Sequence, residues 1–254
     1  MRTGLHCALL LLLLSPACAR AEVVDRMVAV VNKQIILQSE LEQVTRVEFL
    51  LQGRPLDQLT EAEMEKVLDR MIDQDLLQQQ IAQSSVPDPT PPEIAASLRE
   101  VRAQIPGASA DDQWQAMLAR YGVTEQDVAN RIFLQVKVLR FIDLRFRGLA
   151  NVDRAEVDAY YQEKFVPELR KQGAPVPPLN EVSGKLTQIM IEQRIDEMLD
   201  EWLQKTLRGQ ARIEKFNADG APLGEGVFGG GLESKETKSP GKIGVVRSGI
   251  GDRQ

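Results

Sequence analysis

Two short apolar segments separated by a two-residue turn constrain the fold of this chain more than any other feature. Residues 28–31 (VAVV) and 35–37 (IIL) are rich in β-branched side chains, which favour strands, and Asn32-Lys33 lies between them. Lys33 departs from the usual pattern, since Gly is preferred where the second turn residue needs a positive φ. An isolated two-stranded hairpin is only marginally stable in water. The ribbon therefore needs a third strand from elsewhere in the chain.

The stretch from residue 39 to 208 divides into segments of helical periodicity, each with a start signal. A capping box places Ser, Thr or Asp three residues before an acid, so that each side chain satisfies a free backbone N–H of the other. The pattern predicts Gly122 as a helix C-cap, residues 166–178 as a proline-rich connection, and one long helix over about 180–208. The predicted helix starts are Ser39, Thr60, Thr90, Thr124 and Asp153.

The third strand is predicted near the C-terminal end of this helical region. Residues 211–216 (ARIEKF) follow Gly209 and are short and alternating enough to form a strand. The sequence therefore predicts a mainly α fold, a multi-helix module over residues 22–216 that a small antiparallel sheet of N- and C-terminal strands closes. From Asn217 to Gln254, Gly-rich and charged pieces alternate, and they cannot bury enough apolar area to offset the entropy of ordering. We expect this tail to be disordered.

The first 21 residues have the pattern of a secretory signal peptide. Arg2 supplies a positive start, residues 5–14 are apolar, and small residues follow Pro16. Cleavage is expected after Ala21, with a second small-residue site that ends at Ala19. The alternative is a lipoprotein signal with Cys18 as the lipidated residue. The apolar run is too short to cross a bilayer, which needs about 20 residues. We therefore expect a periplasmic protein with no stable membrane insertion.

Cleavage after Ala21 limits the chemistry of the remaining chain. The single histidine, His6, and both cysteines, Cys7 and Cys18, lie in the leader. Without imidazole and thiol groups, we expect no catalytic triad and no zinc site of the usual kind. The prediction of no cofactor and no enzyme activity rests on the resemblance described below. Loss of two basic residues changes the net charge from −6 to −8. An acidic exported protein is not expected to bind nucleic acid.

The blocks along the chain resemble a known family. "VDRMVAVVNKQIILQSELE" and "VLDRMIDQDLLQQQIAQ" are similar to the N-terminal domain of SurA, the periplasmic chaperone of outer-membrane proteins. "LARYGVTEQDVANRIFLQVKVLRFID" and "VDRAEVDAYYQEKF" resemble later parts of that domain, and "RIDEMLDEWLQKTLRGQARIE" resembles the helix and strand that complete it. The likeness covers nearly all of residues 23–216. It implies a chaperone that works without ATP.

The same resemblance implies that the enzyme half of the family is missing. Members usually carry one or two parvulin-type peptidyl-prolyl isomerase domains before the last long helix. The corresponding gap here, residues 166–178, has 13 residues, whereas a domain needs at least about 50. The parvulin pocket also carries histidines, which the chain lacks after residue 21. The resemblance thus indicates the chaperone module alone.

The expected function is that of a holdase, which binds unfolded or nascent envelope and outer-membrane proteins in an apolar groove between helices. From residue type, the groove walls are predicted near the second and third helices at Phe49, Trp114, Met117 and Tyr121. Ordinary core packing is the alternative for each of these side chains. Two other functions stay open, a structural subunit of an envelope complex and a divergent peptidyl-prolyl isomerase.

Overall fold

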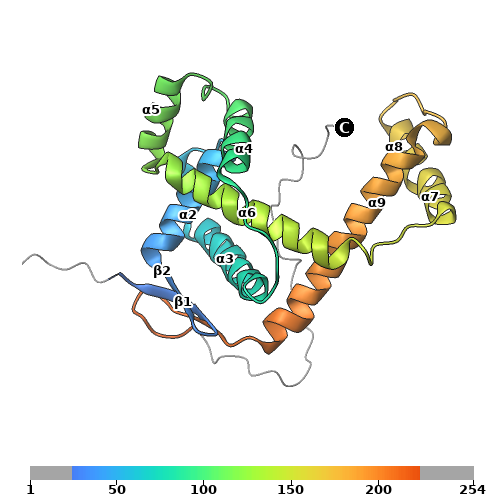
Figure 1. Ribbon diagram of the computed structural model, residues 1–254. Helices are drawn as coiled ribbons and strands as arrows, with labels where there is room; N and C mark the ends of the chain where they lie inside the picture. The colour runs from blue at the N-terminus through green and yellow to red at the C-terminus, as the bar shows by residue number, and fades with distance from the viewer. Residues whose placement is uncertain (1–24, 224–254) are drawn as a thin grey trace, which may run out of the picture.

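The computed structural model describes residues 25–223, and its elements keep the labels of Figure 1. The expected signal peptide, residues 1–21, lies outside the described residues, as does the predicted tail from residue 224 onward. The described chain is mainly helical and includes a small antiparallel sheet. The elements are β1 (Met27–Val31), β2 (Gln34–Leu37), α2 (Gln38–Leu51), a 3₁₀ turn (Leu56–Gln58), α3 (Glu61–Ile81), α4 (Pro91–Gln104), α5 (Asp111–Tyr121), α6 (Glu125–Phe146), α7 (Arg154–Tyr160), a π-helical turn (Tyr161–Phe165), α8 (Val166–Lys171), α9 (Leu179–Glu201), its π-helical continuation (Trp202–Arg208) and β3 (Ile213–Lys215).

The sheet joins the two ends of the described chain, as the sequence predicts. Its strand order is β2-β1-β3, and both pairings are antiparallel. Asn32 takes a φ of 58°, a left-handed conformation in which Asn is enriched. Among residues 25–223 it is the only non-Gly residue with positive φ, so Lys33 does not occupy a position that requires Gly. The Asn32 side chain also accepts a hydrogen bond from the backbone N–H of Arg212 at 3.0 Å and thereby connects the turn to the residue before β3.

Most predicted helix starts are confirmed. Thr90, Thr124 and Asp153 each form a complete capping box with the acid three residues later, and Thr60 accepts a hydrogen bond from the backbone N–H of Glu63 at 3.3 Å. Each box satisfies backbone N–H groups that have no partner inside the helix. Gly122 ends α5 with a φ of 65°, as expected of a left-handed C-cap.

The capping box predicted at Ser39 is wrong. Helix α2 begins one residue earlier, at Gln38, with Leu37 as N-cap and no capping side chain of its own. Asp25, which lies before β1, accepts hydrogen bonds from the backbone N–H and the hydroxyl of Ser39 instead. These bonds hold the pKa of the Asp25 carboxyl below its usual value. The cap is thus supplied across the hairpin, by a residue 14 positions away.

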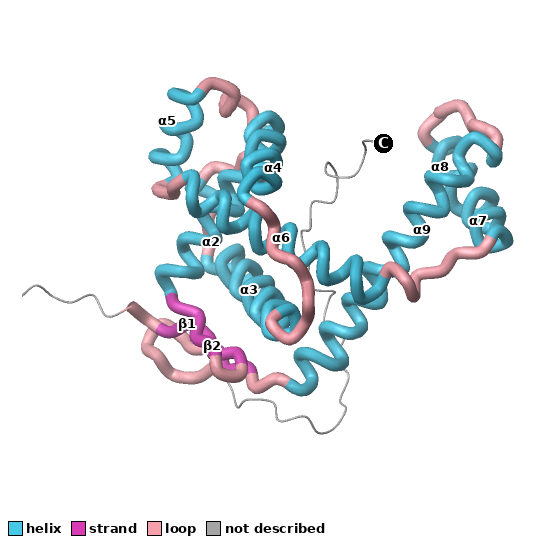
Figure 2. The backbone as a smooth tube through the Cα atoms, in the orientation of Figure 1, coloured by secondary structure: helices cyan, strands magenta, loops and turns pink. Residues whose placement is uncertain are grey.

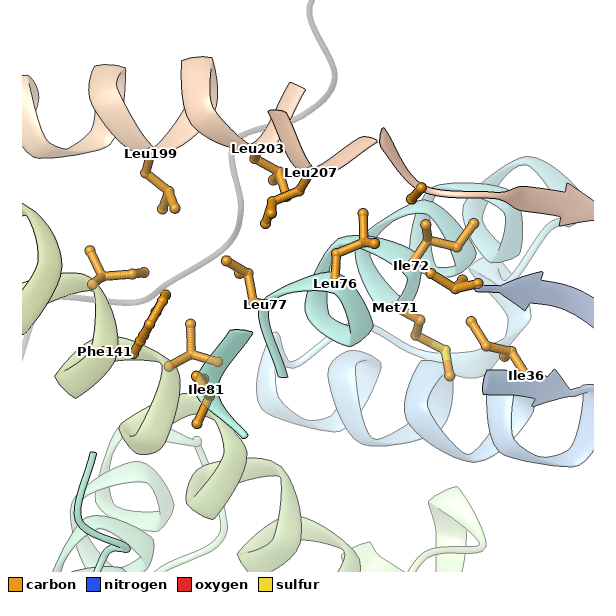
Figure 3. Close-up of a cluster of buried hydrophobic side chains, with 14 of the residues drawn as sticks. Ile36, Met71, Ile72, Leu76, Leu77, Ile81, Phe141, Leu199, Leu203 and Leu207 are labelled. Carbon is orange, nitrogen blue, oxygen red and sulfur yellow. The ribbon is translucent and has the colours of Figure 1, made fainter. Parts of the chain in front are cut away.

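Two hydrophobic cores meet along α6; Figure 2 shows the course of this helix between the segments that form them. The first core packs the sheet, α3, the C-terminal half of α6 and the end of α9; Figure 3 shows Leu199 and Leu203 on one side of it and Phe141, Leu77 and Ile72 facing them. The second core packs α2, α4 and α5 against the N-terminal half of α6. Its buried members are Val47, Phe49, Leu50, Ile105, Ala108, Trp114, Leu118, Tyr121, Val123, Val128 and Ile132.

An arm formed by α7, α8 and the N-terminal half of α9 diverges from the helices around the second core (Figure 1). Val157, Val166 and Leu186 are buried within it and belong to neither core. The stretch 166–178, predicted as a proline-rich connection, is only partly so. Its first half is helix α8, which continues α7 and the π-helical turn without a break, with Pro167 shortly after that turn.

The chain beyond β3 keeps regular hydrogen bonds for several residues. The backbone N–H of Asn217 donates to Ala221 at 2.9 Å, the N–H of Leu223 donates to Lys215 at 2.7 Å, and Phe216 pairs with Pro222. These bonds form a tight turn that folds back on β3. Residues 217–223, which the sequence places in the disordered tail, therefore fold back on β3 in the described chain. The remainder of the predicted tail lies outside the described residues.

Candidate functional site

The side chains predicted as groove walls lie together, but inside the second core. Trp114 is 0%, Phe49 2% and Tyr121 7% exposed, while Met117 is half-buried against the same cluster. Buried side chains present no surface to a client, so the predicted groove wall is corrected for Phe49, Trp114 and Tyr121, whereas for the half-buried Met117 it stays a prediction. The physical reason is that the aromatic faces of α2 and α5 pack against each other, and α4 and α6 complete the same core.

The polar groups of these aromatic residues have partners within the module. The Trp114 indole N–H donates to Glu125 at 2.7 Å, and the Tyr121 hydroxyl donates to the backbone oxygen of Arg54 at 2.8 Å. Arg54 also lies over the Phe49 ring, 4.3 Å from its centre. Buried Trp and Tyr side chains usually bond their polar ends in this way. The cluster therefore has the properties of a specific, satisfied core.

A cleft of about 360 Å³ opens on another face of the module, where β2, α2, α3 and α6 meet. Apolar side chains form part of its wall and alternate with amides, so that the surface offers both apolar contact and hydrogen-bond donors and acceptors. The sheet contributes Ile35 to the lining, and this residue is 56% exposed. The lining residues are Gln34, Ile35, Glu40, Gln43, Val44, Val47, Met71, Gln74, Asp75, Gln78, Asp127, Asn130, Arg131 and Leu134.

The charges of the cleft are mostly negative. Asp75 of α3 is half-buried, and burial raises the pKa of its carboxyl to about 6, with a smaller contribution from the negative charge of Glu40. Among residues 25–223, neither Asp75 nor Glu40 is paired with a cation. Asp127 accepts a hydrogen bond from Gln43 at 2.6 Å. Arg131 is the one cation that lines the cleft in the described chain.

Arg131 is held at the base of the cleft by a buried carboxylate. Glu48 of α2 is 7% exposed and forms ion pairs with Arg131, at 2.7 Å, and with Arg70 of α3. The Arg131 guanidinium also donates to the side-chain oxygen of Gln74, and desolvation lowers its pKa from the ordinary value. These contacts join α2, α3 and α6 and direct both terminal nitrogens of Arg131 toward Glu48 and Gln74. The acids Glu40 and Asp75 are therefore not neutralised by it.

Replacing Asp75 with Asn is expected to stabilise the protein at pH 7.5. The folded-state pKa of about 6 lies above the unfolded value, so the carboxyl contributes stability at pH values below 4 that is lost as the pH rises through 6. Asn imitates the neutral form at every pH. We expect a gain of about 1–2 kcal/mol at pH 7.5, which is less than the full shift implies because the carboxyl is only half-buried. Thermal unfolding followed by circular dichroism measures it.

The gain should shrink as the pH falls and vanish near pH 4, where Asp75 of the wild-type protein is itself protonated. Glu65→Gln is the matched control, because Glu65 is exposed on the same helix and outside the cleft. A gain that persists at pH 4, or a loss of stability at pH 7.5, would contradict the burial of an unpaired carboxylate.

A second hollow, of about 710 Å³, lies in the arm between α7 and the start of α9. Small and polar groups such as Ser183, Gly184 and Thr187 line its α9 side, and Asp153 and Arg154 line its α7 side. Asp153 is occupied as the cap of α7. None of the residues that line this hollow in the described part of the chain has a large apolar side chain that is exposed, so it is a weaker candidate than the cleft.

No group of His, Cys, Asp or Glu side chains between residues 25 and 223 has the arrangement of a metal site. In the same part of the chain, no helix combines the length and apolar character needed to cross a bilayer. Comparison with known proteins finds no matching family model and no matching curated protein. The resemblance to SurA therefore stays a prediction.

Sequence reasoning missed the residues of the cleft, although some of them carry a signal. Ile35 is an apolar residue next to a hairpin turn, and residues 73–80 (DQDLLQQQ) combine two acids with four amides inside a helix that otherwise has an apolar stripe. An acid at position 75, flanked by that stripe, is the residue most readily found. The local sequence pattern does not show that α6 lies opposite Asp75 in the folded chain.

Proposed function

We propose that the chain is an exported, ATP-independent holdase that binds unfolded envelope proteins, outer-membrane proteins among them. The observation that carries the proposal is the cleft, in which an exposed Ile35 and apolar side chains alternate with amides beside an edge strand. Such a surface suits an unfolded polypeptide, which offers both backbone hydrogen-bonding groups and apolar side chains. The client site is thus assigned to the cleft and no longer to Phe49, Trp114 and Tyr121.

The composition of the cleft supports weak, exchangeable binding. An extended client loses chain entropy on docking, and a cleft of this size contacts only a short segment. Affinities in the micromolar range, about −8 kcal/mol, are therefore expected. Contacts of this strength let a client dissociate without nucleotide hydrolysis. Export itself is proposed from the pattern of residues 1–21, which lie outside the described chain.

The experiment is the suppression of aggregation by the protein without residues 1–21. A denatured outer-membrane barrel protein is diluted into buffer, and light scattering is followed with the wild-type protein, with Gln78→Trp and with Gln83→Trp. Gln78 lines the cleft, so Trp at this position fills it; Gln83 is exposed beyond the end of α3 and is the matched control. We expect wild type and Gln83→Trp to delay aggregation at several-fold molar excess and Gln78→Trp to be at least about fivefold less effective.

No delay by the folded wild-type protein would contradict the holdase proposal and favour a structural subunit. Co-purification from a periplasmic extract then separates the two, since a holdase retains many polypeptides and a subunit retains one. Equal activity of all three proteins would place the client site outside the cleft.

A further inference from the structure

Among the strands of residues 25–223, β2 has one free edge, because in the order β2-β1-β3 it pairs only with β1. Val31 and Gln34 flank the two-residue turn and pair with each other, and Val30 pairs with Ile35. Residue pairs in an antiparallel ladder alternate between hydrogen-bonded and non-hydrogen-bonded, and the pair that closes a two-residue turn is hydrogen-bonded. The backbone N–H and C=O of Ile35 therefore point away from β1.

The cleft lies on this free side of the strand. Its lining includes Gln34 and Ile35 of β2 but no residue of β1, while α2, α3 and α6 supply the remaining walls. The amide side chains of Gln34, Gln74 and Gln78 flank the space. An unpaired strand edge is a template for another extended chain, and β-strand addition is a common mode of peptide recognition.

The charge of the cleft defines the kind of chain that fits. Glu40 of α2, Asp75 of α3 and Asp127 of α6 contribute negative charge, and the facing Arg131 is held by Glu48 and Gln74. A Lys or Arg side chain has an apolar stem, which suits the apolar wall, and a cationic head, which suits these carboxylates. An acidic segment would instead meet like charges in a half-buried space.

We propose that an extended polypeptide segment with a basic side chain among apolar ones adds to the free edge of β2 as a fourth strand. The segment pairs with the backbone of Ile35 and places its basic side chain near Asp75 and Glu40. The inference rests on the proposed function, since it specifies how the holdase recognises a client. Backbone pairing tolerates many sequences, and the four-residue length of β2 keeps each complex short-lived.

The experiment measures binding of three fluorescein-labelled ten-residue peptides by fluorescence anisotropy. The first alternates Val and Thr around a central Lys; the second is the same peptide with its four central amides N-methylated; the third has Glu in place of Lys. The first peptide should bind the wild-type protein in the micromolar range, and N-methylation, which removes backbone donors, should weaken it at least about tenfold. The Glu peptide should bind about fivefold more weakly, and Asp75→Asn should reduce that difference.

Ile35→Pro removes the outward N–H, and Pro is tolerated on edge strands where the N–H faces away from the sheet. It should weaken the Lys peptide at least about tenfold, whereas Ile35→Val, which keeps the N–H, should bind within about twofold of wild type. Hydrogen exchange of the Ile35 amide gives a second measurement that needs no variant. Addition of the Lys peptide should slow this exchange.

Equal binding of the Lys peptide and its N-methylated form, or unchanged exchange at Ile35 with bound peptide, would overturn the strand-addition proposal. A protein that suppresses aggregation yet binds none of the peptides would refute this inference and leave the holdase proposal standing. A protein that binds the Lys peptide as expected but does not suppress aggregation would refute the holdase proposal and leave the strand-addition inference standing. Protection of the Ile35 amide in the absence of peptide would show that the edge is already covered, and it too would overturn the proposal.

Discussion

Replacing Glu48 with Gln is expected to destabilise the protein by about 3 kcal/mol. The Glu48 carboxylate is 7% exposed and is the shared partner of Arg70 and Arg131. Removing its charge leaves two partly buried guanidinium groups without their anion, and an uncompensated buried charge is among the most destabilising changes in a protein interior. For a module of this size the thermal midpoint should fall by roughly 10 °C.

Glu42→Gln is the matched control for this substitution. Glu42 lies on the same helix and pairs with Arg46 at 3.4 Å, but both side chains are more than 40% exposed. An exposed i, i+4 pair contributes at most about 0.5 kcal/mol, so this variant should melt within about 2 °C of wild type. Equal midpoints for the two variants in circular dichroism would show that Glu48 is not a buried junction between the helices.

Removal of β3 is expected to have the largest effect. A chain that ends at Gly209 loses the strand that pairs with Ala29, Val30 and Val31, together with Ala211 of the first core. What remains of the sheet is a two-stranded hairpin, which is marginally stable on its own. Since a domain is stable by only about 5–15 kcal/mol, we expect this chain to be largely unfolded at 37 °C.

The reference for this truncation is a chain that ends at Leu223, which retains every contact described for β3 and the turn after it. Urea unfolding followed by tryptophan fluorescence reports on both cores, because Trp202 packs on the first and Trp114 is buried in the second. A single transition at the same urea concentration for both chains would mean that β3 does not contribute to closing the module.

The architecture could be predicted because it depends on local signals. The boxes at Thr90, Thr124 and Asp153 are properties of four consecutive residues and form whether or not another helix is near. The third strand followed from a physical requirement, since the hairpin at residues 27–37 could not be stable alone. The capping box predicted at Ser39 is wrong because the partner of Ser39 is Asp25, which lies on the other side of the hairpin. A pattern of four consecutive residues does not include it.

The candidate site could not be predicted in the same way. Helical periodicity shows that Phe49, Trp114 and Tyr121 lie on apolar faces, but it does not show whether another helix covers those faces. In the structure α2, α5 and α6 pack these faces against one another, and α4 packs on the same cluster. Conversely, Asp75 and Ile35 come from α3 and β2, and only the packing of α2 and α6 around them produces a cleft. Burial and concavity arise from contacts between distant segments, so residue type alone does not locate a cleft.

The antiparallel pairing of β1 with β3 also determines how the module responds to mechanical force. Ala29 near the start of β1 pairs with Lys215 at the end of β3, whereas Val31 pairs with Ile213. The chain therefore enters β1 and leaves β3 at the same end of the pair. A pull on the two termini separates the strands one residue pair at a time, in the manner of a zipper, without loading all of their hydrogen bonds at once. We therefore expect β1 and β3 to separate first under tension, while the helices that form the cleft still keep their contacts.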